Sequence, residues 1–486
     1  MEIIPYQPYI DPEFESLIER IHPPRRKSFF FLICRVCIDN DAYQDCTLVK
    51  VDSANKHGIL LEMVQVLTDL ELVISKSYIS SDGGWFMDVF HVTDQLGNKL
   101  TDETLILYIQ QALCASRRGE GASSEVQKCL KRDVRPRHVS TENTALEVTG
   151  VDRPGLMSEI SAVLYELGCH VPAAVAWTHK ARAACIFYIE DGLEGRPITA
   201  PEMLAHVEEQ LEIVVGAHHG EGETRSVRLT TPMPGRTHTE RRLHQLMYAD
   251  RDYELCRGCD GGAGHWNGCT RTHVLIDSCK EKGYSVVNIK CIDRPKLLFD
   301  TLCALTDLQY VVFHAAISSK GCFADQEYFI RQTDGCTLDT ENQRQKLTQC
   351  LIAAIERRVS HGLRLEICTQ NRMGLLSDVT RAFRENGLSV SMSEIGTNGE
   401  KATGSFYVMD ASGHDVNQRT VELLKQEIGG SVLVVNKSSN RTSQASSVSL
   451  SRSSSGGGSL DDRPKFSLGN LLWSRLERLS GNFSLI

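Results

Sequence analysis

A short motif that could bind a small zwitterion occurs four times along the chain. It reads NKHGILLEM from Asn55, DRPGLMSEI from Asp152, DRPKLLFDT from Asp293 and NRMGLLSDV from Asn371. Each copy follows a strand-like run and opens a helical pattern, which places it in the loop before a helix. The first N–H groups of a helix have no intrahelical partner and carry partial positive charge, which suits a carboxylate. The opening Asp or Asn could accept a hydrogen bond from an ammonium group.

These loops are therefore candidate sites for a small zwitterion. A glycine in the loop permits close approach to the backbone, and Lys296 stands where the other copies have a glycine, so the third copy is the weakest candidate. The candidate ligand-binding residues are Asn55, Gly58, Ile59, Asp152, Gly155, Leu156, Asp293, Leu297, Asn371, Gly374 and Leu375. The alternative is structural, because an Asp or Asn before a helix is usually a cap and a glycine there turns the chain.

A second set of residues has metal-ligand chemistry. Cys256, Cys259, His265 and Cys269 are spaced C-x2-C-x5-H-x3-C in a Gly-rich stretch. Four soft ligands at close spacing could bind zinc tetrahedrally. The x5 and x3 spacings each differ by one residue from those of a zinc knuckle. We therefore interpret the stretch as a Cys-rich linker and expect neither metal nor cofactor.

No catalytic constellation accompanies these motifs. The sequence has no P-loop, no G-x-G-x-x-G after a strand, no H-E-x-x-H and no G-x-S-x-G. The four copies also take up most of the chain. We therefore predict a protein that is not an enzyme.

The elements that must position the motifs recur with them. After each motif's helix come two strand-like runs joined by a turn, and then a second helical stretch. The fourth copy ends on a further strand-like run, 431–435, whereas the last strands of the first and third copies are not visible. Strand, helix, strand, strand, helix, strand is the ferredoxin-like βαββαβ order, an antiparallel sheet with both helices on one face.

DRPGLMSEI inside such a unit resembles the ACT domain, a regulatory module that binds small molecules. Four units in one chain, with NKHGILLEMVQVLTDLELVISKSYISSDGGWFMDVFHVTD and DRPKLLFDTLCALTDLQYVVFHAAIS, resemble the plant ACT domain repeat proteins. The resemblance covers residues 40–436, and the tail KFSLGNLLWSRLERLSGNFSLI fits it too. It implies an amino-acid-binding regulatory protein whose ACT units associate side by side, with ligands at the interface.

The expected fold class is α+β, with four ferredoxin-like βαββαβ (ACT) modules. The expected modules are residues 41–125, 140–220, 284–360 and 361–436. The expected flanking parts are an N-terminal segment 1–40 with an insertion at 26–34 that a gene-model error would explain, a linker 221–283, a Ser-rich disordered linker 437–465 and an amphipathic helical tail 466–486.

The four modules could pair internally, two by two. The short join between the third and fourth modules makes these two plausible neighbours. In the tail, leucines recur at helical spacing from Leu468 to Leu479. We expect this helix to dock on the chain's own modules, with a partner protein or a membrane surface as alternatives.

Composition limits the classes of partner and the compartment. The chain of 486 residues has 53 Lys and Arg against 62 Asp and Glu, a net charge of −9, which argues against nucleic-acid binding. No apolar run approaches the ~20 residues that span a bilayer, and the acidic, Pro-broken N-terminus is no signal peptide. We therefore expect the 17 cysteines to be mostly free thiols of a cytoplasmic protein. The basic stretch 128–137 leaves the nucleus possible.

Three functions fit these observations. The leading prediction is an intracellular sensor of a free amino acid. The second is a ligand-free scaffold of ACT modules for protein–protein interaction. The third is a regulatory subunit of an enzyme of amino-acid metabolism.

Overall fold

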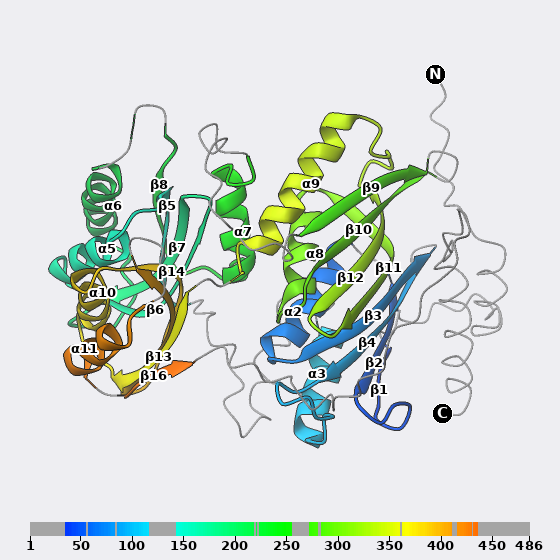
Figure 1. The fold of residues 1–486 in the computed structure, drawn as a ribbon, viewed down its shortest axis with the longest axis horizontal. Helices are drawn as coiled ribbons and strands as arrows, with labels where there is room; N and C mark the ends of the chain where they lie inside the picture. The colour runs from blue at the N-terminus through cyan, green and yellow to red at the C-terminus, as the bar shows by residue number, and fades with distance from the viewer. Residues whose placement is uncertain are drawn as a thin grey trace, which may run out of the picture.

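The chain forms two eight-stranded antiparallel sheets, shown side by side in the computed structural model (Figure 1). The strand orders are β1-β2-β4-β3-β11-β12-β10-β9 and β16-β13-β15-β14-β6-β7-β5-β8. The structure describes residues 35–54, 57–82, 85–115, 142–217, 220, 223–254, 272–279, 283–359, 362–410, 416–429 and 431–435.

The first sheet joins the first and third repeats. The first repeat comprises β1 (Arg35–Asp39), β2 (Thr47–Ala54), α2 (Ile59–Asp69), β3 (Val73–Asp82), β4 (Trp85–Thr93) and α3 (Glu103–Ala115). The third repeat comprises β9 (His273–Cys279), β10 (Tyr284–Ile292), α8 (Leu297–Asp307), β11 (Tyr310–Lys320), β12 (Phe323–Gln332) and α9 (Glu341–Glu356).

The second sheet joins the second and fourth repeats. The second repeat comprises β5 (Thr144–Val151), α5 (Leu156–Glu166), β6 (Cys169–His179), β7 (Arg182–Asp191), α6 (Pro201–Gly216) and β8 (Ser226–Thr230). The fourth repeat comprises β13 (Leu363–Gln370), α10 (Leu375–Glu385), β14 (Leu388–Asn398), β15 (Lys401–Asp410), α11 (Gln418–Ile428) and β16 (Ser431–Val435). One further helix, α7 (Thr239–Ala249), lies between the second and third repeats.

All four repeats have the ferredoxin-like architecture, but two of them reach it in a different chain order. In the second and fourth repeats the edge strand comes last, as β8 and β16, and the order is βαββαβ. In the first and third repeats the edge strand comes first, as β1 and β9, and pairs antiparallel with β2 and β10. The edge strand can come first or last in the chain order of a repeat. When it comes first, a short connection joins it directly to the strand with which it pairs, as antiparallel pairing allows.

Two expected boundaries are therefore wrong in part. The segment expected as linker, 221–283, contains β8, α7 and β9, and the N-terminal segment expected at 1–40 contains β1. The edge strands β1 and β8 are five residues long and lie in stretches that the sequence analysis assigned to the N-terminal segment and to the linker. The insertion expected at 26–34, the Cys256–Cys269 set, the Ser-rich linker and the helical tail lie outside the described residues.

The repeats pair two by two, but the expected pairing of neighbours is wrong. β3 of the first repeat pairs antiparallel with β11 of the third, with Ser80 opposite His314. β6 of the second repeat pairs in the same way with β14 of the fourth, with Trp177 opposite Met392. Each seam joins the edge strands that the two repeats would otherwise expose, so the pairing satisfies two open edges at once.

Hydrophobic cores lie between each sheet and its helices. One core combines the first and third repeats, and a second combines the second and fourth. A third, smaller core lies on the opposite face of the second sheet, where Leu243, Leu246 and Met247 of α7 pack against β5, β6 and β7. Because α7 also contacts α8, it joins the two halves of the molecule (Figure 1).

Candidate functional site

The four motif loops lead into their helices through one left-handed residue. Its φ is 85° at Gly58, 86° at Gly155, 65° at Lys296 and 75° at Gly374. Glycine adopts this conformation without steric cost, whereas a lysine there is strained. The local backbone therefore explains why the motif carries glycine in three of its four copies.

The opening Asp and Asn do not cap these helices. The residue before each of the four helices is the left-handed one, and none of the four helices has a side-chain cap hydrogen bond. Asn371 and Asp152 lie three residues earlier in the loop, so their side chains remain available for another role. This observation removes the capping alternative for these two residues; Asn55 lies outside the described residues.

The second and fourth repeats are related by a pseudo-twofold axis. At its centre the hydroxyls of Ser161 on α5 and Thr380 on α10 are hydrogen-bonded at 2.8 Å, 219 residues apart in the chain. The same separation relates Asp152 to Asn371, Gly155 to Gly374 and Tyr165 to Arg384. Each motif loop therefore faces the end of the other repeat's helix.

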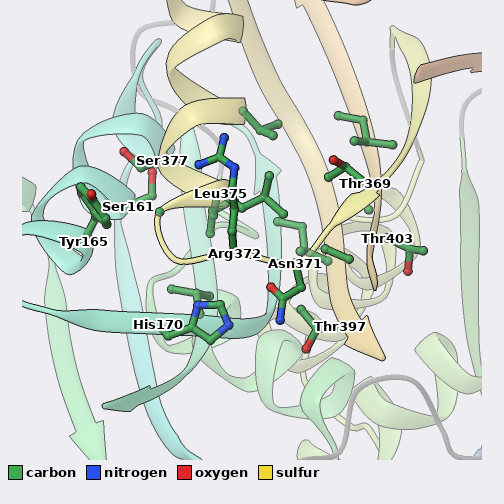
Figure 2. Close-up of a pocket in the computed structure, with 18 of the residues that line it drawn as sticks. Ser161, Tyr165, His170, Thr369, Asn371, Arg372, Leu375, Ser377, Thr397 and Thr403 are labelled. Carbon is green, nitrogen blue, oxygen red and sulfur yellow. The ribbon is translucent and has the colours of Figure 1, made fainter. Parts of the chain in front are cut away.

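One cavity, of about 40 Å³, lies beside the loop of the fourth repeat, and we call it the Asn371 pocket. The fourth repeat contributes Asn371, Gly374 and Leu375, and the second repeat contributes Tyr165 and His170 (Figure 2). The Oδ1 atom of Asn371 is buried and has no hydrogen-bond partner among the described residues. A buried acceptor without a partner costs free energy, which a donor from a ligand would recover.

Tyr165 closes the Asn371 pocket over the loop. A Cβ atom on Gly374 would lie 2.8 Å from the Tyr165 ring. Tyr165 as a whole residue is 51% exposed and belongs to α5, so the second repeat covers the loop of the fourth repeat. Figure 2 shows the amide of Asn371 directed away from α10, on the side where His170 and Thr397 lie.

The pseudo-symmetric cavity, of about 20 Å³, lies beside the loop of the second repeat, and we call it the Asp152 pocket. Burial raises the pKa of Asp152 to about 6, although the backbone N–H of Arg153 opposes this shift. The Arg153 guanidinium does not neutralise Asp152, because it donates to Glu159 at 2.9 Å and to the carbonyl of Val214. Arg384 covers this loop, with its Cδ atom 3.1 Å from a Cβ on Gly155.

Replacing Asp152 by Asn, the residue of the fourth repeat, should stabilise the protein at neutral pH. The folded carboxyl holds its proton up to about pH 6 while the unfolded one releases it near 3.8, so stability falls between these values as pH rises. Above pH 6 the variant should gain up to about 3 kcal/mol in free energy of unfolding, and near pH 4 almost nothing. Urea unfolding at both pH values measures this, and an equal gain at both would contradict the burial of an ionisable carboxyl.

The other two loops differ from this pair. In the third repeat, Asp293 and Leu297 line a cavity with Lys296, whose ammonium group lies 2.7 Å from a carboxylate oxygen of Glu240 on α7. In the first repeat, Ile59 is buried in the core and a Cβ on Gly58 would meet nothing within 4 Å. The candidate residues thus do not form four equal sites.

Sequence reasoning missed the half of each pocket that the paired repeat supplies. Tyr165 and His170 belong to the second repeat but line the Asn371 pocket, and Arg384 of the fourth repeat lines the Asp152 pocket. A comparison of the last turn of the repeated helices would have singled out Tyr165 and Arg384. That comparison could not have assigned either residue to a pocket, because the pairing of the repeats was unknown.

Three family models match the chain. The model described as the ACR family N-terminal ACT domain matches residues 42–120, an ACR9-like, ACT-like domain matches 273–368, and the ACT domain matches 363–429. The ACT domain-containing protein ACR1 of Arabidopsis thaliana is 56% identical, with 98% of each chain covered. Protein ACR3 of the same plant is 51% identical, over 88% of this chain and 90% of its own. Protein ACR2 is 45% identical, over 98% of this chain and 98% of its own.

The chain belongs to the plant ACT domain repeat family. The ACT-like match at 273–368 begins at the first residue of β9, which agrees with an edge strand that opens the third ACT repeat. The names of these matches describe ACT domains and none of them a catalytic domain. Within the described part of this ACT repeat protein, no helix is long and apolar enough to cross a membrane.

Proposed function

We propose that this ACT repeat protein is a non-catalytic regulatory protein that senses a free amino acid at the interface of its second and fourth repeats. The observation that carries the proposal is the buried Oδ1 of Asn371, which has no hydrogen-bond partner in the described part of the chain and lies beside a cavity at the start of α10. The α-ammonium group of the ligand donates to this oxygen, and the α-carboxylate accepts from the first N–H groups of α10.

The ligand joins two repeats, because the pocket draws its walls from both. Tyr165 and His170 approach from the second repeat and Asn371 from the fourth. A ligand held there stabilises the paired form, and its free energy of binding adds to the free energy of unfolding. The regulated partner contacts the chain elsewhere. The predicted C-terminal helix, which lies outside the described residues, is the segment available to such a partner if it does not dock on the chain's own modules. We place the protein in the cytoplasm, with the nucleus as the alternative.

A thermal-shift screen of the proteinogenic amino acids tests the proposal. At a hundredfold excess over Kd, an amino acid that binds only the folded chain should add about 2.7 kcal/mol to its stability. Asn371→Leu should remove that gain, because it deletes the acceptor, whereas Asn342→Leu on the exposed start of α9 is the matched control. An equal gain in wild type and Asn371→Leu would exclude this pocket, and no gain with any amino acid would favour the ligand-free scaffold.

A further inference from the structure

The outer face of the first sheet carries buried side chains, although no described helix lies over it. Helices α2, α3, α8 and α9 are on the other face of this sheet, where its hydrophobic core lies (Figure 1). Successive residues of a strand point to opposite faces, so Lys50, Val89 and His91, which adjoin core residues of β2 and β4, point outward. They are nevertheless only 3%, 2% and 2% exposed. A lysine is rarely buried to this extent.

The same face continues across the seam into the third repeat. Tyr78 of β3 lies beside the seam, and its ring centroid is 6.0 Å from that of His91. Beyond the seam, the Tyr284 ring lies 5.5 Å from the Phe313 ring and 5.4 Å from the Phe329 ring, between centroids. All three rings are partly buried. We call Tyr78, Tyr284, Phe313 and Phe329 the outer aromatic cluster.

The second sheet shows how such a face is covered. There α7 is separated from β8 by eight residues, and its Leu243, Leu246 and Met247 pack on the outer face of β5, β6 and β7. Strand β8 pairs antiparallel with β5, as β1 does with β2, so β8 and β1 are equivalent edge strands. Because β1 comes first in its repeat, the segment adjoining it in the chain is the one that precedes it, residues 1–34.

The preceding segment lies outside the described residues, but the sequence of its residues 11–22, DPEFESLIERIH, predicts an amphipathic helix. Asp11 is a typical N-cap, and Pro12 suits the first helical position. The apolar residues recur at i, i+3, i+4 and i+7, and they are Phe14, Leu17, Ile18 and Ile21. The 12 residues 23–34 can span roughly 40 Å, whereas the four strands of one repeat extend over only about 20 Å.

We propose that residues 11–22 form a helix that packs on the outer face of the first sheet, as α7 packs on the second. Its apolar side covers Val89 and the outer aromatic cluster. Glu327 on this face has a buried Oε2 without a hydrogen-bond partner among the described residues, and Arg20, at the border of the apolar side, is the donor that the helix offers. The C-terminal tail follows β16, which is an edge strand of the other sheet. The regulated partner therefore contacts the chain away from this face.

Hydroxyl-radical footprinting of the full chain tests the proposal, because oxidation of an aromatic ring depends on its exposure to solvent. Leu17→Asp places a charge in the proposed contact, so the helix should leave the face and oxidation of Tyr78 and Phe329 should rise at least roughly threefold. Ser16→Asp, on the opposite side of the same helix, is the matched control and should leave both rates at the wild-type value. Mass spectrometry of peptides measures each residue separately. Unchanged oxidation in Leu17→Asp would overturn the proposal.

Two further measurements separate the proposal from unfolding and from other occupants. Trp177, which is 2% exposed beneath α7, is oxidised only if the second sheet opens. If its oxidation rises in Leu17→Asp, the milder Leu17→Ala replaces that variant under the same criterion. A chain truncated after residue 436 should protect Tyr78 and Phe329 as wild type does. Loss of protection in the truncated chain alone would assign the face to the C-terminal tail, and protection lost on dilution would assign it to a second copy. Either result would overturn the proposal.

Discussion

Replacing Asp252 by Ala should lower the free energy of unfolding by about 3–5 kcal/mol, the usual cost of breaking a buried ion pair from one side. The Asp252 side chain is 0% exposed, and it lies 2.6 Å from Arg357 after α9 and 2.9 Å from His179 on β6. The change leaves Arg357 buried without its carboxylate, at the point where α7 joins the two halves. Urea unfolding measures the loss.

The control is Asp325→Ala, which removes a half-exposed carboxylate 3.5 Å from Lys290. Surface pairs contribute between 0 and about 1 kcal/mol, so this variant should be almost as stable as wild type. Although burial opposes ionisation, Arg357 and His179 lower the pKa of Asp252 to about 2. Its contribution is therefore complete above pH 4 and lost as pH falls through 2. Equal losses for Asp252→Ala and Asp325→Ala would refute the buried pair.

Replacing Gly374 by Val should reduce both stability and the amino-acid response. A β-branched residue at a φ of 75° adds strain of about 1–3 kcal/mol, and the new Cβ would meet the Tyr165 ring at 2.8 Å. Displacing Tyr165 removes the cover of the Asn371 pocket, so affinity for the best amino acid of the screen should fall at least roughly tenfold. Urea unfolding and isothermal titration measure the two effects.

Variants in the three other loops distinguish backbone strain from steric overlap. Gly58→Val has the same strain, at a φ of 85°, but a Cβ there meets nothing within 4 Å. Gly155→Val meets the flexible Cδ of Arg384 at 3.1 Å, so its loss of stability should lie between the other two. Lys296→Gly should relieve strain in the third loop and leave titration at the Asn371 pocket unchanged. Equal affinity in wild type and Gly374→Val would remove this loop from the site.

The local parts of this fold were predictable because they depend on residues close in sequence. Each helix begins directly after the left-handed residue of the motif, and Gly155 has the positive φ that its loop requires. The amphipathic pattern of Leu243, Leu246 and Met247 was also visible at helical spacing, but it stood in a stretch interpreted as linker. Helix α7 was therefore not predicted, although its apolar residues have helical spacing, because the stretch around it was interpreted as a linker.

The parts that could not be predicted depend on which repeats pair. All four repeats offer a similar edge strand, so the sequence does not distinguish β3–β11 from a pairing of neighbours. The choice fixes which side chains meet each motif loop, and without it Tyr165 and His170 could not be assigned to the Asn371 pocket. The environment of Asp152 depends on the same choice, since Arg384 comes from the fourth repeat.

The alternation of partners along the chain has a consequence for its synthesis. The seam between β3 and β11 joins residues more than 200 positions apart, as the contact between Ser80 and His314 shows with a separation of 234. As the nascent chain leaves the ribosome, the first and second repeats emerge with their seam edges open, and neither can close until its partner has been made. Contacts of such long range form slowly, and open edges are prone to wrong pairing. A ribosome that stalls after the second repeat would therefore leave two unpaired strand edges on one polypeptide. These two edges could then bind chaperones or pair wrongly with each other.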